Sequence, residues 1–85
     1  ETLELILKQE SLTFENVAAI GDDFNDLSLL RSVGLSFAPC DALPLVREEV
    51  DVVLSLGGGR GAVREMIDEV VKRENLSEEF LKLWL

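Results

Sequence analysis

The stretch "AAIGDDFNDLSLL", residues Ala18–Leu30, carries three aspartates between an apolar run and a helical pattern. The apolar run begins one residue earlier, at Val17, and is typical of a strand buried on both faces of a parallel sheet. A glycine ends the run, and Asp22, Asp23 and Asp26 follow it. Carboxylates about 4 Å apart repel each other by roughly 4 kcal/mol at an effective dielectric constant near 20. A favourable interaction must therefore offset the repulsion inside this cluster.

Helix and strand patterns alternate along the whole chain. Leu27, Leu30 and Val33 share one face of a helix that Gly34 closes. In chain order, the patterns predict a helix over 2–9, a strand over 17–20, a helix from 25 or 26 to 33, a strand over 35–38, a short helix over 41–49 capped by Asp41 with Pro44 near its first turn, a strand over 52–54, a helix from 63 to about 73, and a last short helix over 78–84. This order predicts an α/β fold whose parallel strands are joined by right-handed crossovers.

The predicted sheet is small for an open α/β fold. It has three strands, whereas open sheets usually have about five or six. The first helix also has no preceding strand from which to cross over. We therefore interpret residues 1–85 as a single partial domain, the C-terminal half of a doubly wound parallel-sheet domain, with 75–85 as a C-terminal tail helix. The missing half is expected upstream.

The composition narrows the classes of function. Of the 85 residues, 47% are hydrophobic and 29% are charged, which is typical of a folded protein. Seventeen acidic residues against eight basic ones argue against a nucleic-acid partner, and the absence of histidine argues against histidine catalysis. The single cysteine, Cys40, cannot form an internal disulfide, and neither a signal peptide nor a long apolar run is visible. We therefore expect a cytoplasmic protein without a membrane partner.

The aspartates follow a strand of the predicted sheet at its carboxyl end. Ligands of open α/β sheets bind at that edge, and Mg²⁺ prefers carboxylate oxygens. The alternative is that Asp22 and Asp23 are solvated loop acids and that Asn25 or Asp26 only caps the next helix. An EF-hand is excluded by spacing, because the loop lacks the required glycine and glutamate. A Mg²⁺ site and a plain acidic loop both remain open at this point.

The wider motif resembles a known family. "IGDDFND" is similar to the fourth motif of the haloacid dehalogenase superfamily of phosphatases. The pairing of "GDDxND" with "GGRGAVRE" resembles, more narrowly, the C-terminal half of 3-deoxy-D-manno-octulosonate 8-phosphate phosphatases and a similar domain fused to some sialic-acid cytidylyltransferases. The resemblance extends from about Leu3 to about Val71 and implies a partial haloacid-dehalogenase-like, Rossmannoid domain.

The resemblance also implies a reaction and roles for residues. Asp22 would bind Mg²⁺ directly, and Asp23 and Asp26 would support catalysis by binding a metal-bound water or a lysine that grips the phosphate. The nucleophile of such phosphatases is an aspartate of a DxDxT/V motif, which this chain lacks. The resemblance thus implies a phosphatase for a small phosphorylated sugar acid, completed by the missing half and inactive as this fragment alone. The similar phosphatases form tetramers, which implies a homo-oligomer.

The glycine-rich stretch "GGGRGA", residues Gly57–Ala62, permits three interpretations. It formally matches the dinucleotide fingerprint G-x-G-x-x-A, but no strand with an acidic residue follows at the required distance. It can also be a tight strand-to-helix connection. Thirdly, its backbone N–H groups and Arg60 can face an anionic substrate at the start of a helix. On this last interpretation Arg60 binds substrate, while Arg64 is a surface ion-pair partner of nearby acids.

The C-terminal tail is unusually apolar, and two interpretations of it remain. The tail can pack on the sheet of its own domain or on the missing half, or it can form an oligomer contact. Its apolar residues are Phe80, Leu81, Leu83, Trp84 and Leu85. For the whole chain, the rival to an enzyme is a binding or regulatory module that keeps the fold and has lost catalysis. An upstream DxDxT/V motif would favour the enzyme over that module.

Overall fold

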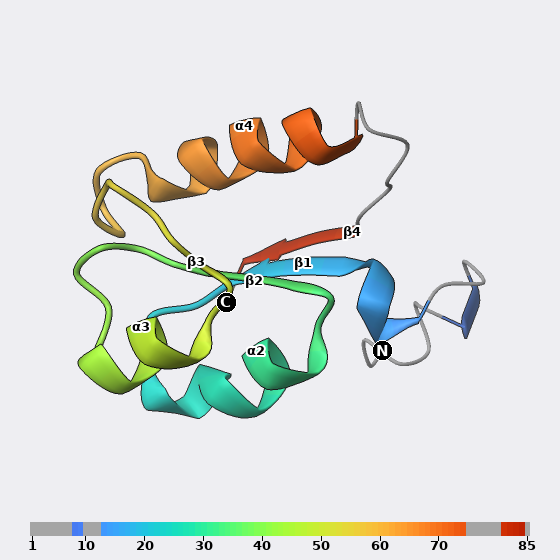
Figure 1. Cartoon of the computed structure of the whole chain (residues 1–85), viewed down its shortest axis with the longest axis horizontal. Helices are drawn as coiled ribbons and strands as arrows, with labels where there is room; N and C mark the ends of the chain where they lie inside the picture. The colour runs from blue at the N-terminus through green and yellow to red at the C-terminus, as the bar shows by residue number, and fades with distance from the viewer. Residues whose placement is uncertain (1–7, 10–12, 75–80, 85) are drawn as a thin grey trace.

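A computed structural model describes residues 8–9, 13–74 and 81–84 of the chain. Within these residues, a four-stranded parallel sheet has helices on both faces (Figure 1). The strands lie in the order β3-β2-β1-β4. Their bounds are Val17–Ile20 for β1, Leu35–Ala38 for β2, Val52–Val53 for β3 and Leu81–Trp84 for β4. The parallel α/β class predicted from the alternating patterns is confirmed.

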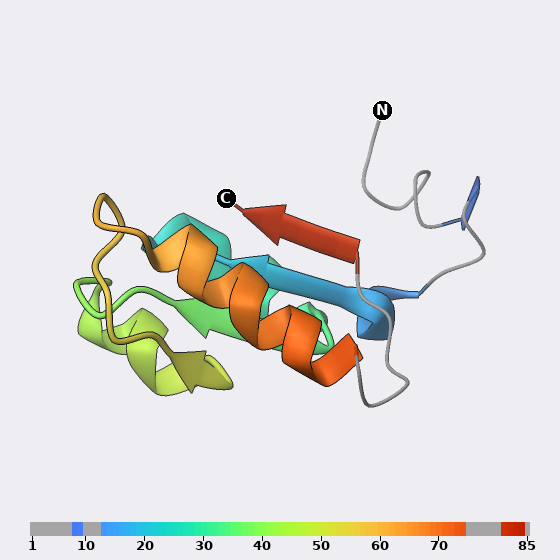
Figure 2. The same cartoon turned by 90° about the horizontal axis from the view of Figure 1, so that it is seen from above.

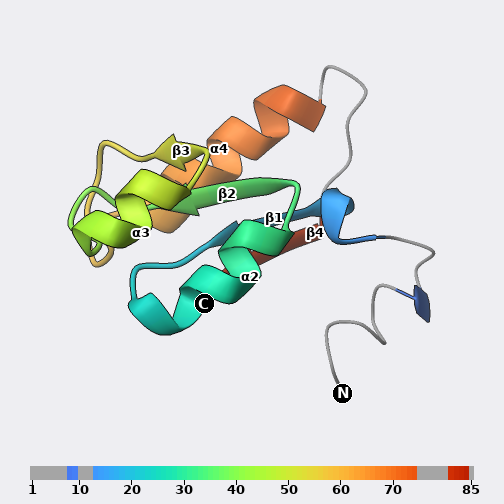
Figure 3. The ribbon, with the colours of Figure 1, turned by 60° about the horizontal axis from the view of Figure 1, so that its bottom comes forward.

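The helices divide between the two faces of the sheet. Helices α2 (Leu27–Ser32) and α3 (Pro44–Glu49) lie on one face, and α4 (Ala62–Glu74) lies on the other (Figures 1 and 3). Two short 3-10 turns, η1 (Phe14–Asn16) and η2 (Phe24–Asp26), flank β1. Successive residues of β1 contribute to opposite cores. The α2/α3 side contains Val17, Ala19, Leu27, Leu30, Ala38, Ala42 and Val46, and the α4 side contains Ala18, Ile20, Leu35, Phe37, Leu54, Ala62, Met66 and Val70.

The path of the chain creates a switch point beside β1. From β1 the chain passes through α2 to β2 and through α3 to β3, each step in the same direction across the sheet. Helix α4 then crosses the opposite face, and β4 pairs with β1 on its other side (Figure 2). In open α/β sheets the crevice at such a reversal, beyond the carboxyl ends of the strands, is where ligands bind. The aspartate cluster begins two residues after β1, at this edge.

The predicted terminal helix over 78–84 is wrong for the residues described. Residues 81–84 form β4, which runs parallel to β1 with Ile20 opposite Trp84. In Leu-Lys-Leu-Trp the polar Lys82 stands between two leucines, a pattern that a strand accommodates, and the edge of β1 away from β2 offers backbone groups with which these residues pair. Pairing with that edge overrides the weak helical pattern, so the sheet has a fourth strand. Residues 75–80 and 85 lie outside the described residues.

One further helix prediction is wrong in its cap, and another can be compared with the structure over only two residues. Asp41 does not cap α3: the N-cap is Leu43, and Pro44 is the first helical residue. Pro44 disfavours a helical conformation in the residue before it, which explains the later start. Lys8 and Gln9 are helical as expected, and the rest of the predicted 2–9 helix lies outside the described residues. Among the helices described, none is long and apolar enough to cross a membrane.

Helix α4 packs on the sheet through a narrow apolar stripe. Met66 and Val70 are buried in the core, and Ala62 joins them one turn earlier. Val63 and Ile67 are only half-buried, whereas Val71 is 44% exposed. The stripe nevertheless holds the start of α4, and the loop before it, against the α4 side of β1 and β2.

Candidate functional site

Three loops meet at the carboxyl edge of the sheet, and backbone hydrogen bonds join them. The Leu43 N–H, in the loop after β2, donates to the Asp22 carbonyl after β1 over 3.3 Å. The Cys40 N–H, in the same loop after β2, donates to the Leu56 carbonyl after β3 over 3.0 Å. The loop after β2 therefore bridges the other two. The aspartate cluster and the glycine-rich stretch, distant in sequence, belong to one site.

The turn after β1 is held by one of its own carboxylates. Asp26 Oδ2 accepts hydrogen bonds from the backbone N–H groups of Asp22 and Asp23, each over 3.2 Å. Asp26 comes so near the end of β1 that a Cβ added to Gly21 would lie 2.8 Å from the Asp26 Cβ. Gly21 is thus required by close approach. The sequence predicts a favourable interaction that offsets the repulsion among these carboxylates. For the Asp26 carboxylate, the two backbone N–H donors provide such an interaction.

The Asp23 side chain also stabilises the turn after β1. Its carboxylate accepts a hydrogen bond from the Phe24 N–H over 2.6 Å, and Asp23 and Asp26 cap η2 reciprocally. Asp22 differs from both, because its exposed carboxylate has no hydrogen bond within the described part of the chain. Two aspartates therefore shape the loop, and the third presents its carboxylate to whatever binds there.

Two adjoining hollows open beside Asp22. One, of about 250 Å³, is lined by Ile20, Gly21, Asp22, Pro39, Gly58, Ala62 and Val63. The other, of about 310 Å³, is lined by Asp22, Asp23, Asp41 and Leu43. Asp22 is common to both. Small residues keep the first hollow open: a Cβ added to Gly58 would lie 3.9 Å from Asp22 Oδ2, so this glycine stands directly across from the carboxylate.

The glycine loop, defined here as residues 57–61, is anchored at its base by a carboxylate of α4. Glu65 accepts hydrogen bonds from the Ser55 N–H over 3.0 Å, the Ser55 hydroxyl over 2.8 Å and the Leu56 N–H over 3.0 Å. These hydrogen bonds, the Ser55 N–H foremost, lower the pKa of Glu65 against an opposing effect of desolvation. At the other end of the loop, Gly61 has a φ of 98°, a conformation that favours glycine.

The lowered pKa of Glu65 predicts a pH-dependent stability. A carboxyl group whose pKa is lower in the folded state stabilises it fully above the ordinary glutamate pKa of about 4.3, and this stabilisation is lost as pH falls through the lowered folded value. We therefore expect Glu65→Gln to be less stable than the wild type at neutral pH, with a difference that shrinks in acid. Urea unfolding of both proteins at a series of pH values measures it. Glu48→Gln, at an exposed position of α3, is the matched control, and a Glu65→Gln difference that stays constant with pH contradicts the assignment.

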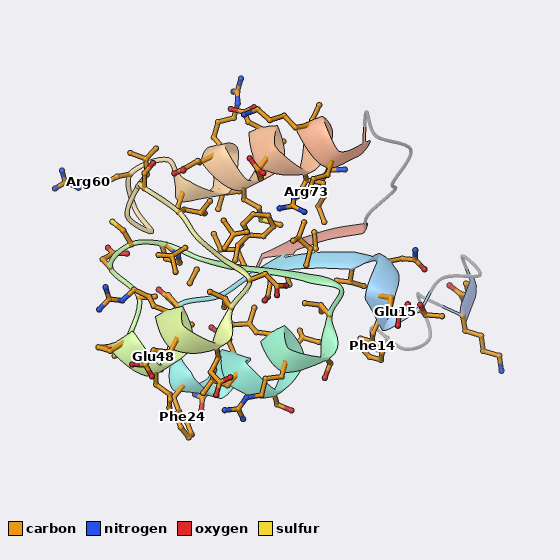
Figure 4. The ribbon with its side chains drawn as sticks, viewed as in Figure 1. Phe14, Glu15, Phe24, Glu48, Arg60 and Arg73 are labelled. Atoms are coloured by element: carbon orange, nitrogen blue, oxygen red, sulfur yellow. The ribbon has the colours of Figure 1, made fainter. Side chains whose placement is uncertain are left out.

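Arg60, the predicted substrate contact, lies at the tip of the glycine loop. It is exposed and points outward from the body of the protein in Figure 4. It is not among the residues that line the two hollows beside Asp22. Arg64 forms an exposed ion pair with Asp68 over 3.4 Å, which confirms its prediction as a surface partner. A substrate role for Arg60 therefore stays a prediction.

The donor set of this edge suits a shared metal site. Within the described residues, no three carboxylate or thiol side chains converge in the way needed to hold a metal ion. Among Asp22, Asp23, Asp26 and Asp41, the aspartates described at this edge, Asp22 is the one whose carboxylate accepts no hydrogen bond, which fits a cation such as Mg²⁺ that takes one or two carboxylates. The roles expected for Asp22 as a direct ligand and for Asp23 and Asp26 as supporting residues stay predictions.

Sequence reasoning missed two residues of this site, Asp41 and Glu65. Asp41 was assigned to a helix cap, but its Oδ1 accepts a hydrogen bond from the Gly58 N–H over 2.9 Å. The sequence pattern gives Glu65 no role in the site, whereas in the structure it accepts hydrogen bonds from Ser55 and Leu56. Its position in the first turn after the glycine loop was a usable signal, since a carboxylate there can reach backbone N–H groups of the preceding loop.

Comparison with known proteins gives consistent results. The profile of the haloacid dehalogenase-like hydrolase family matches residues 1–67. The 3-deoxy-D-manno-octulosonate 8-phosphate phosphatase of Haemophilus influenzae is 44% identical over 75 residues, which are 88% of this chain and 42% of that protein. The phosphatase of the same name from Escherichia coli K12 is 40% identical over 74 residues, 87% of this chain and 39% of that protein. The chain thus spans less than half the length of these relatives.

Solved structures agree with the sequence comparison. The cobalt-bound form of the Haemophilus influenzae phosphatase superposes with a TM-score of 0.77 at 43% identity, covering 85% of this chain and 42% of that one. The Yersinia pestis 3-deoxy-D-manno-octulosonate 8-phosphate phosphatase gives a TM-score of 0.76 at 38% identity, covering 92% of this chain and 43% of that one. The fold of this chain is therefore that of part of a larger known fold.

Proposed function

Because the chain belongs to the haloacid dehalogenase-like hydrolase family, we propose that it is the Asp22-bearing half of a metal-dependent phosphatase. Its substrate is a small phosphorylated sugar acid of the 3-deoxy-D-manno-octulosonate 8-phosphate type, the compound named in its relatives. The relatives are more than twice as long as the matched region, so an upstream half is proposed to complete the domain.

One observation carries the proposal: the free carboxylate of Asp22 stands where the two hollows adjoin. Asp23 and Asp26 are occupied by the hydrogen bonds of their own turn, which leaves Asp22 as the donor of the cluster. The turn also fixes the backbone from which the Asp22 side chain projects, because Asp26 Oδ2 accepts hydrogen bonds from the backbone N–H groups of Asp22 and Asp23. A fixed backbone at the ligand position supports a metal site, because it limits where the carboxylate can reach.

Asp22 would hold a divalent cation together with donors from the upstream half. When bound, such a cation neutralises negative charge on a transferring phosphoryl group. Asp26 holds the Asp22 and Asp23 amides, and Asp23 holds the start of η2, so both keep Asp22 in place. We propose that their remaining oxygens support the site through water or an upstream lysine. Arg60 would approach an anionic substrate from the glycine loop.

The reaction proposed for the complete domain has two displacements. An aspartate of the upstream half attacks phosphorus, the bond from phosphorus to the ester oxygen breaks, and the sugar acid leaves with a proton supplied by a second upstream carboxylic acid. Water then attacks the aspartyl-phosphate, loses a proton to that same carboxylate, and releases inorganic phosphate. This chain contributes the metal ligand and two walls of the cavity, and none of the covalent chemistry.

Location and assembly complete the proposal. We propose a cytoplasmic enzyme, because the single cysteine of residues 1–85 has no disulfide partner within them. A homo-oligomer, a tetramer in the similar phosphatases, is proposed from the family resemblance.

The test uses an extended protein in which this chain is preceded by an upstream half, taken from its own gene or from the Haemophilus influenzae relative. We expect the extended protein to hydrolyse p-nitrophenyl phosphate and the sugar-acid phosphate only when Mg²⁺ or Co²⁺ is present. The 85-residue chain alone is expected to be inactive, because it lacks a nucleophile motif. Phosphate release measured with and without a chelator tests whether hydrolysis depends on the divalent metal.

Two results would contradict the proposal. If the extended protein still hydrolyses the ester after all divalent metal has been removed, the reaction does not depend on a metal ion bound by Asp22. An extended protein that binds metal at Asp22 and still hydrolyses no phosphate ester would favour the rival function, a binding or regulatory module of the same fold.

A further inference from the structure

We propose that Asp41 is a positioning residue that holds the glycine loop in place across from Asp22. The inference rests on the proposed function, because it concerns the geometry of that same site. Neither the sequence pattern nor the resemblance assigned Asp41 any role beyond a helix cap, and the structure removes that role.

Both oxygens of the Asp41 carboxylate face the glycine loop. Oδ1 accepts a hydrogen bond from the Gly58 N–H over 2.9 Å. Oδ2 lies 2.9 Å from the position that a Cβ on Gly57 would occupy, so the carboxylate packs directly against that glycine. A side chain at position 57 would collide with the carboxylate. Asp41 and the two glycines are therefore fitted to each other.

The glycine loop needs such a contact. Three consecutive glycines have more backbone freedom than any other tripeptide, and a Cβ added to Gly59 would meet no atom within 4 Å. Glu65 fixes the chain at Ser55 and Leu56, before the glycines begin. Among the described side chains, Asp41 is the one that donates or accepts a hydrogen bond within the loop itself. Apart from this contact, the hydrogen bonds described for the loop are between backbone groups: the Arg60 N–H donates to the Gly57 carbonyl and the Glu65 N–H donates to the Gly61 carbonyl, each over 3.0 Å.

The position of the loop matters because Gly58 is a wall of the hollow beside Asp22. Asp41 lines the neighbouring hollow with Asp22, Asp23 and Leu43. The Leu43 N–H in turn donates to the Asp22 carbonyl. The segment 41–43 is thus bound at one end to the glycine loop and at the other to the turn that carries Asp22. Loss of the Asp41 carboxylate would release Gly58 and leave Asp22 in place.

A competing role for Asp41 is electrostatic, since its carboxylate lies in the same hollow as Asp22. The two roles separate by substitution with asparagine. Asparagine retains an oxygen that can accept from the Gly58 N–H and removes the negative charge. Positioning therefore predicts that Asp41→Asn resembles the wild type while Asp41→Ala does not. A charge or ligand role predicts that both variants fail alike.

The first experiment is hydrogen exchange of backbone amides on the extended protein. We expect the Gly58 amide of Asp41→Ala to exchange about tenfold faster than in the wild type, because a hydrogen bond to a charged group is lost. Asp41→Asn should retain most of the protection, and Glu48→Ala, at an exposed position of α3, should retain all of it. Equal Gly58 exchange in the wild type and in Asp41→Ala overturns the inference.

The second experiment measures kinetics of the extended protein. We expect Asp41→Ala to raise KM about tenfold and to change kcat less than about threefold, since the displaced wall weakens substrate binding more than the chemistry at Asp22. Asp41→Asn should restore KM to near the wild-type value. Equal losses in the alanine and asparagine variants overturn positioning in favour of a charge role. If KM is unchanged in Asp41→Ala, the positioning role of Asp41 is wrong and the proposed function still stands. If the wild-type extended protein is inactive, the proposed function itself is contradicted.

Discussion

Replacing Asp22 with asparagine should reduce the phosphatase activity of the extended protein by about a hundredfold or more, with the fold intact. Asparagine keeps the size of the side chain and removes the charged oxygen that a divalent cation prefers. The fold should not change, because the Asp22 side chain is exposed and the structure around it uses only its backbone N–H and carbonyl. Steady-state kinetics and circular dichroism together measure the two effects.

A matched control separates this effect from a general loss of acidic charge. Glu48→Gln removes one negative charge from an exposed position of α3 that lines neither hollow beside Asp22, and it should leave activity within about twofold of wild type. Metal titration adds a second readout, because Asp22→Asn should need a higher metal concentration for any remaining activity. If Asp22→Asn keeps wild-type activity and needs no more metal than the wild type, Asp22 is not a metal ligand.

The aspartate site was predictable from sequence because it depends on order along the chain. A short apolar strand followed by glycine and acids places those acids at the carboxyl edge of a parallel sheet whichever strands are its neighbours. The division of roles inside the cluster was not predictable. It depends on the Asp26 carboxylate turning back to two amides, and that geometry exists only once Gly21 allows the close approach.

Contacts between loops explain the residues that sequence reasoning missed. Asp41 and Gly58 are 17 positions apart, and no periodicity in the chain relates them. Their hydrogen bond forms because β2 and β3 are neighbours in the sheet, which brings the loops after these strands together. A local pattern could only present Asp41 as a helix cap, the commonest role for an aspartate shortly before a helix.

Strand β4 shows how an unpaired edge can override a local pattern. Residues 78–84 carry acids before apolar residues, which is typical of a helix start. The edge of β1 away from β2 offers backbone hydrogen-bonding groups, and residues 81–84 pair with all four residues of β1. The choice between helix and strand was therefore decided by a strand more than 60 positions earlier, beyond the reach of any local window.

Replacing Gly34 with alanine should destabilise the fold by about 3 kcal/mol, at the upper end of the usual cost of overpacking. A Cβ at this position would overlap the Glu15 carbonyl oxygen and lie 2.7 Å from the Glu15 carbonyl carbon. Neither side can move away easily. The Gly34 N–H donates to the Phe14 carbonyl over 2.9 Å, and the two segments lead directly into β1 and β2, which are buried and paired.

The measurement is urea unfolding of the 85-residue chain, followed by circular dichroism. Gly59→Ala is the matched control, because a Cβ there would meet no atom within 4 Å and should change stability by less than about 0.5 kcal/mol. A small domain has only about 5–15 kcal/mol of total stability, so the Gly34 variant should lose a large share of it and unfold at a clearly lower urea concentration. Equal midpoints for Gly34→Ala and Gly59→Ala would contradict the close approach of η1 to the start of β2. The register of β1 against β2 would then need revision, since both strands begin at this contact.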